Sequence, residues 1–177
     1  AEDSLMLGAF CNGKEYPEQL EFLKVIVDSG AAVSALPTDA CKQYPLTWHE
    51  DKGREYYAAN GTRVLDEGRR QPELWTSDGK KRQIAFSVAK VRKPLFSVSK
   101  SIDLGNRIVF DADGSYIEDK ANGEQTVIDR ENGVFTMKFW VAPKPIKEGA
   151  DVQQLAPFGH GGASGSQDRP PIRPVRT

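Results

Sequence analysis

The sequence is poor in the residues that bind metals or cross-link chains. Its 177 residues include two cysteines, Cys11 and Cys41, and two histidines, His49 and His160. No pair among them has the spacing of a zinc site, so we expect no metal and no other cofactor. A Cys11–Cys41 disulfide and two reduced thiols both stay open, and reduced thiols are the simpler interpretation for an intracellular protein.

Long apolar runs are also missing. No stretch of about 18 apolar residues is present, and the first ten residues lack the charged and apolar regions of a signal peptide. We therefore expect an intracellular protein with no membrane partner. The formal net charge of -1 gives no overall attraction to nucleic acid. The basic clusters GRR (68–70) and KKR (80–82) border turn signals, and we interpret them as solvated turns, not as a phosphate-binding surface.

Short strand-like runs between turn residues predict an all-β fold. Hairpin turns are expected where Asn, Asp or Gly interrupt these runs: Asn60-Gly61, Asp78-Gly79, DADG (111–114), ANG (121–123) and ENG (131–133). One short helix is expected in SKSIDLGN, with Ser99 or Ser101 as its N-cap and Gly105 as its end. Period-two spacing predicts two buried strand faces: Ile84, Phe86 and Val88, and Phe135, Met137, Phe139 and Val141.

The most informative segment is VIVDSGAAVS (25–34), an apolar run that ends in an acid and a turn. One interpretation is an ordinary β-turn in which Asp28 bonds its own backbone. The other is half of an aspartic protease site, where two carboxylates about 3 Å apart share one proton and activate water. In that case Ser29 offers a hydroxyl, Gly30 lets a backbone N–H approach the carboxylate, and Ala31 leaves room for a substrate.

The order of the later segments resembles that of the retropepsin-like aspartic proteases. The acid turn is followed by the hairpin AANGTRV and then by RQIAFSVAKVRKPLFSVSKSIDLGNRIVF, which contains a second apolar segment, a short helix and a further strand. PLFSVSKSIDLGNRIVF followed by GVFTM resembles the protease region of copia-type LTR-retrotransposon polyproteins. The resemblance covers roughly residues 20–141.

This resemblance implies a closed β-barrel with a flap hairpin and one short helix, in a symmetric homodimer. Residues 1–110 would form the protease core, 111–142 a β-hairpin extension, and the proline-rich segment 143–177 a flexible linker or tail. The activity implied is that of an aspartic endopeptidase that processes a gag-pol polyprotein, bound as an extended peptide, in the cytoplasm or in virus-like particles. Because TSDG and FDADG lie at hairpin turns, one acid turn remains per chain, and a dyad requires two chains.

The resemblance also implies residue roles. Asp28 would be catalytic, with Ser29, Gly30 and Ala31 as its support. The residues expected to contact substrate are Ala32, Val33, Ala59, Asn60, Gly61, Leu95, Phe96 and Val98. Ile108 and Phe110 would lie in the dimer interface, on a strand whose apolar edge needs a partner.

Some positions depart from the retroviral branch of the family. Ala32 stands where an acid is usual, Lys100 lies near the position of an Arg, and Ser97 or Ser99 replaces a glycine before the helix. The flap has a single glycine. These changes follow the copia-type pattern, but they keep an alternative open, a catalytically silent or monomeric retropepsin-like module that binds peptides. Nucleic-acid binding is the least favoured alternative.

Overall fold

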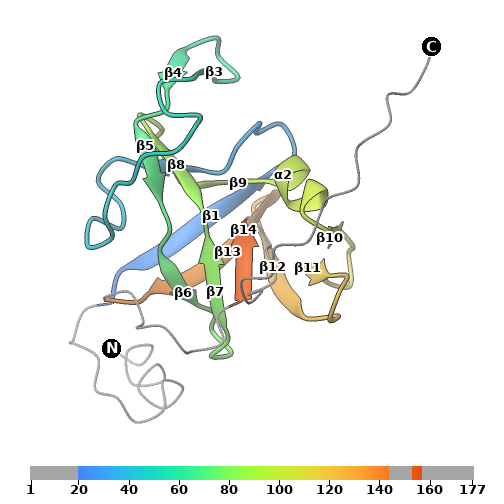
Figure 1. The fold of residues 1–177 in the computed structure, drawn as a ribbon. Helices are drawn as coiled ribbons and strands as arrows, with labels where there is room; N and C mark the ends of the chain where they lie inside the picture. Colours follow the sequence, from blue (N-terminus) through green and yellow to red (C-terminus); the bar gives the residue numbers. More distant parts are fainter. Residues whose placement is uncertain (1–19, 144–152, 157–177) are drawn as a thin grey trace, which may run out of the picture.

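The computed structural model describes residues 20–143 and the backbone of residues 153–156 (Figure 1). The elements, in chain order, are β1 (Phe22–Asp28), β2 (Ala35–Pro37), β3 (Glu55–Tyr57), β4 (Arg63–Leu65), β5 (Gly68–Arg70), β6 (Glu73–Trp75), β7 (Lys81–Ile84), β8 (Phe86–Ala89), β9 (Leu95–Ser97), α2 (Val98–Asp103), β10 (Asn106–Val109), β11 (Ser115–Asp119), β12 (Gln125–Glu131), β13 (Val134–Val141) and β14 (Gln153–Ala156). The all-β prediction is confirmed, and α2 is the one helix in these two ranges. It is also true of these ranges that no helix is long and apolar enough to cross a membrane.

Most strands belong to one mixed sheet of 12 strands. Its main path is β10-β11-β12-β13-β1-β9-β2-β8-β5, with β6, β7 and β14 attached beside β13, while β3 and β4 form a separate two-stranded sheet. The path has two ends, β10 and β5, which do not pair with each other. The closed barrel that the resemblance implied is therefore not formed by the strands described.

The centre of the sheet is the pair β1–β13. The strands run antiparallel from Phe22 opposite Trp140 to Ile26 opposite Thr136. The inner faces alternate as period two requires, and these side chains form much of the core: Leu23, Val25, Val27, Met137, Phe139 and Val141. The segment 111–142, expected as an extension beyond the core, thus supplies the strand that lies along β1.

The predicted hairpins are present. Turns connect β3 to β4 at Asn60-Gly61, β6 to β7 at Asp78-Gly79, and β10 through β13 at the three further sites. At the first turn Gly61 has φ +80°, a conformation that glycine adopts without steric cost. Local turn chemistry was sufficient to place these connections.

The predicted start of the helix is wrong. The N-cap of α2 is Ser97, whose side chain accepts from the backbone N–H of Lys100, and neither Ser99 nor Ser101 has this role. The helix follows β9 directly, so the last strand residue has the extended backbone that an N-cap requires. Gly105, with φ +96°, follows the C-cap Leu104, as expected for the helix end.

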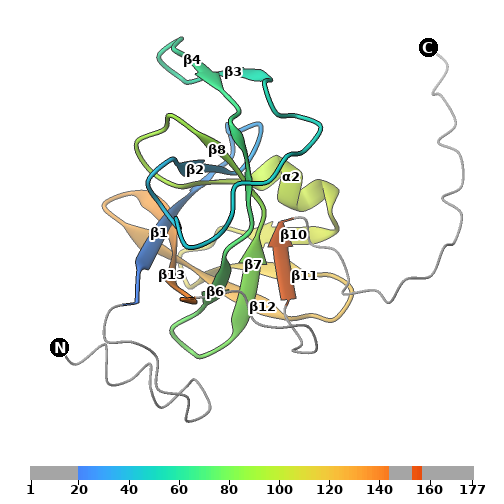
Figure 2. The same cartoon turned by 60° about the vertical axis from the view of Figure 1, so that its left-hand side comes forward.

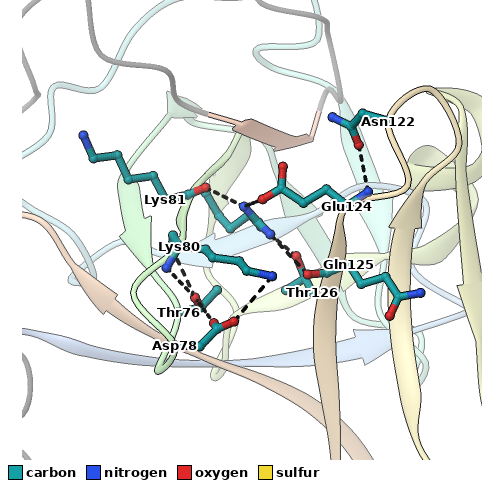
Figure 3. A network of polar contacts seen from close by, with 9 residues as sticks. Thr76, Asp78, Lys80, Lys81, Asn122, Glu124, Gln125 and Thr126 are labelled. Carbon is teal, nitrogen blue, oxygen red and sulfur yellow. Dashed lines mark hydrogen bonds and ion pairs between the residues drawn. The ribbon is translucent and has the colours of Figure 1, made fainter. Parts of the chain in front are cut away.

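The interpretation of the basic clusters as solvated turns is also wrong. GRR forms β5, and Lys81 and Arg82 begin β7. Arg82 is only 1% exposed. Its guanidinium donates to Thr126 Oγ1 (2.7 Å), Glu124 Oε1 (2.8 Å), and the carbonyl oxygens of Lys81 (2.8 Å) and Gln125 (3.2 Å) (Figure 3). Burial of this charge is possible because acceptors from β7, from the turn before β12 and from β12 itself surround it.

Part of the expected tail is described. Residues 153–156 form β14, which runs parallel to β7 with Gln153 opposite Arg82 (Figure 2). The remainder of the segment after Pro143 lies outside the described residues, as do residues 1–19 with Cys11.

Candidate active site

The acid turn lies at the carboxyl end of β1. Asp28 is the last residue of this strand and is partly buried, on the face opposite Val25 and Val27. The Gly30 N–H donates to Asp28 Oδ1 at 2.7 Å. A Cβ atom at Gly30 would lie 3.3 Å from the same oxygen, closer than ordinary van der Waals contact. Glycine therefore permits the approach that orients the carboxylate.

Strand β9 lies directly beside the acid. It pairs with β1 in parallel, with Val27 opposite Phe96 and Asp28 opposite Ser97. Because paired residues project to the same side of a sheet, Val27 and Phe96 both enter the core. Ile26 and Leu95 form the adjacent pair on the side of Asp28, and both are partly buried. The carboxylate thus lies at the end of a small apolar platform.

The loop from residue 29 to residue 34 crosses over the end of β9, because β9 lies between β1 and β2 in the sheet. Two serines hold this crossing, and we call Ser34 and Ser97 the serine clasp. Ser97 Oγ donates to the Ala31 carbonyl oxygen at 2.6 Å, and the Ser97 N–H donates to Ser34 Oγ at 3.0 Å. Ser97 has no exposed surface. The clasp fixes the acid turn against the start of α2.

We expect Ser97→Ala to lower the free energy of unfolding by about 1–2 kcal/mol, because it removes both the N-cap and the bond to Ala31. Urea unfolding of the two proteins measures this difference. Ser77→Ala is the matched control, because Ser77 is exposed in the β6–β7 turn, away from the clasp, and its loss is expected to cost less than about 0.5 kcal/mol. Equal losses for the two variants would contradict the assigned role of Ser97.

The other residues predicted around the acid are distributed unevenly. Ser29 and Ala32 are exposed on the crossing loop, and Ala31 and Val33 are partly buried there. Phe96 and Val98, expected to contact substrate, belong to the hydrophobic core, with 0% and 9% exposure. Of the predicted residues on β9 and α2, Leu95 therefore keeps the most accessible surface beside Asp28.

The predicted flap is the β3–β4 hairpin, which projects beyond the main sheet in both views (Figures 1 and 2). Ala59, Asn60 and Gly61 are exposed at its tip, where Asn60 Oδ1 accepts from the Thr62 N–H at 3.0 Å. The hairpin and the loop after β1 lie at the same end of the molecule in Figure 1. The two strands pair only with each other, so the tip is not held against the acid turn by a strand contact.

The residues predicted for the dimer interface have partners within their own chain. Ile108 on β10 lies opposite Ile117 on β11 and packs against the core. Phe110 is 44% exposed, and its ring lies 4.5 Å from that of Phe135, centroid to centroid. In the sheet as described, β10 is an end strand, so one of its two edges is covered and the other is unpaired.

Other reactive groups fit the site less well. Asp78 and Asp113 lie in hairpin turns, not at the end of a strand beside β1. Burial, followed by the negative charge of Glu21, raises the pKa of the Cys41 thiol to about 12, which leaves it protonated and unreactive at neutral pH. Within the described residues, no group of His, Cys, Asp and Glu side chains could hold a metal ion.

The arrangement offers one oriented carboxylate on an apolar platform, a group that can accept or donate a proton. Sequence reasoning found Asp28 and Gly30 but missed Ser34, whose partner Ser97 is 63 residues away in the chain. The one sequence feature that pointed to this contact was the serine, Ser97 or Ser99, in place of the glycine expected before the helix. A scan against protein-family models finds no match for this chain, and comparison with curated proteins finds no relative.

Proposed function

We propose that the chain is a retropepsin-type aspartic endopeptidase that acts as a homodimer. The observation that carries the proposal is the carboxylate of Asp28, which the Gly30 N–H orients at the end of β1 beside β9. Activation of water for amide hydrolysis requires a second carboxylate close by, so that one is ionised and the other protonated. The other Asp-Gly turns lie at hairpin tips, so the second acid would be Asp28 of another copy.

The substrate would be a peptide segment of a polyprotein, bound in extended conformation. Ile26 and Leu95 would line the apolar platform beside Asp28, and the exposed tip around Asn60 would close over the peptide. Processing of a retroelement gag-pol polyprotein, in the cytoplasm or in virus-like particles, is the role that the resemblance supports. The proposed chemistry uses no cofactor.

A second candidate is a monomeric module that binds peptides without cleaving them. It is favoured by one observation, the pairing of Ile108 with Ile117 in the same chain, which gives β10 a partner without a second copy. The homodimer would instead use the unpaired edge of β10 or another surface. Measurement of turnover against chain concentration separates the two candidates.

We expect cleavage of a quenched peptide library to be inhibited by pepstatin and to gain specific activity as the chain is concentrated, since only dimers are active. A second test mixes equal amounts of the parent protein and the Asp28→Asn variant, with the total chain concentration held constant. The mixture should show about one quarter of the activity of the parent protein at that total concentration, because random pairing makes one dimer in four fully wild type. A control mixture uses an unrelated inert protein at the same concentration. Retention of half the activity at all concentrations would indicate an active monomer, and absence of cleavage would favour the binding module.

A further inference from the structure

The segment that carries the β3–β4 hairpin has a base of its own, distant from Asp28 in the sequence. We call residues 47–69 the arm. Thr47 and Arg69 exchange two backbone hydrogen bonds of 2.8 Å. Further along, the Gly53 N–H donates to the Asp66 carbonyl oxygen (2.8 Å), and the Asp66 N–H donates to that of Arg54 (2.9 Å). The two sides of the arm are thus joined below the hairpin, before it projects from the molecule (Figure 2).

A buried histidine–carboxylate pair lies inside this base. His49 is 7% exposed and Asp66 is 1% exposed, and His49 Nε2 lies 3.0 Å from Asp66 Oδ1. The same oxygen accepts from the Gly68 N–H at 2.9 Å, whereas Asp66 Oδ2 is buried without a hydrogen-bond partner. A buried carboxylate with an unsatisfied oxygen is costly unless a positive charge is near.

The second ring nitrogen of His49, Nδ1, lies between one positively charged and one negatively charged side chain. His49 Nδ1 lies 3.4 Å from Arg69 Nη2 and 4.0 Å from Asp51 Oδ2. Asp51 is also bonded to Arg54, at 3.1 Å. Tyr56 interacts electrostatically with both Asp51 and Asp66, and its buried hydroxyl has no hydrogen-bond partner.

The charges of this cluster affect the pKa of Tyr56. Desolvation raises the pKa of its hydroxyl, and the charges of Asp51 and Asp66 raise it further, against the opposing effect of the two arginines. Around the His49 imidazole the structure thus places two carboxylates, Asp51 and Asp66, and the Arg69 guanidinium. An imidazole is a side chain that can gain or lose a proton near neutral pH.

We propose that His49 and Asp66 form a proton-controlled latch at the base of the arm. In the neutral ring, Nε2–H donates to Asp66 and Nδ1 accepts from Arg69. In the protonated ring both nitrogens donate, so Nδ1 turns from Arg69 to Asp51 while Nε2 forms an ion pair with Asp66. The charged pair compensates the buried carboxylate, so the base is held more firmly when His49 is protonated and opens more often when it is neutral.

The latch is tested by amide hydrogen exchange followed by NMR, on the full chain carrying Asp28→Asn to prevent any self-cleavage. The protection factors of the Gly53 and Asp66 amides are compared at pH 5 and pH 8, each normalised to the intrinsic exchange rate at that pH. We expect protection to be about tenfold higher at the acid pH. The core amide of Val141, which donates to the Glu21 carbonyl oxygen, is the internal reference and is expected to change less.

Three variants control the experiment, two of them in the latch itself. His49→Gln keeps an N–H donor for Asp66 without a titrating ring, and Asp66→Asn removes the carboxylate charge. In both, the difference between the two pH values should disappear. If one of these two variants does not keep the native NMR spectrum, the other provides the test. The third variant, His160→Gln, controls for titration of the second histidine of the chain.

An unchanged protection factor in the parent protein, or an equal change in His49→Gln, would overturn the latch. The measurement requires no peptide cleavage, so failure of the proposed protease function would leave its outcome interpretable.

Discussion

Asp28→Asn is expected to abolish peptide-bond hydrolysis while leaving the fold intact. Asparagine keeps an oxygen that can accept from the Gly30 N–H, so the turn is retained. It cannot take a proton from water, and loss of a general base lowers the rate by about 10²–10⁴-fold. In a dyad the deficit would exceed this range, because both copies carry the change. Initial rates on a peptide that the parent protein cleaves, measured with matched circular dichroism spectra, provide the test.

The controls for this variant come from the same chain. Asp78→Asn and Asp113→Asn alter the other Asp-Gly turns, which lie at the tips of hairpins. Both should keep the parent rate within about twofold, since a surface substitution far from the site changes little. A wild-type rate in Asp28→Asn, or a comparable loss in either control, would refute the assignment of Asp28 as the catalytic acid.

Of all the proposed substitutions, Arg82→Ala is expected to lower the free energy of unfolding the most, by about 3 kcal/mol. The substitution leaves a cavity at a fully buried position and removes the donor that satisfies Thr126 Oγ1. Glu124 is 36% exposed and can recover part of its hydration, which keeps the loss at the lower end for a buried ion pair. In a chain of this length such a loss lowers the melting temperature by about 6–12 °C.

Thermal unfolding of two companion variants separates burial from charge. Lys80→Ala removes a neighbouring cation that is 45% exposed and should cost less than about 0.5 kcal/mol. Glu124→Gln keeps an acceptor oxygen for Arg82 and should fall between the two. If Arg82→Ala unfolds at the same temperature as Lys80→Ala, the hydrogen bonds of Arg82 that are drawn in Figure 3 do not contribute to stability.

The sequence by itself determined the local features of this protein. Turns such as Asn60-Gly61 depend on a residue that tolerates positive φ, and alternating side chains such as Met137, Phe139 and Val141 identify the buried face of a strand. Both signals act between residues close in the chain, so they could be predicted without knowledge of the partners. The acid turn at Asp28 was found in the same way.

The tertiary structure decided which distant residues and strands these local elements contact. The position of β9 beside Asp28 brings Ser97 to Ser34, and the open ends of the sheet replace the expected closed barrel. Three of the four acceptors around Arg82 belong to residues more than 40 positions away in the chain, although Lys80 and Lys81 beside it indicate a solvated segment. Such pairings depend on which arrangement buries the most apolar surface while satisfying most buried polar groups, and that balance is a property of the whole chain.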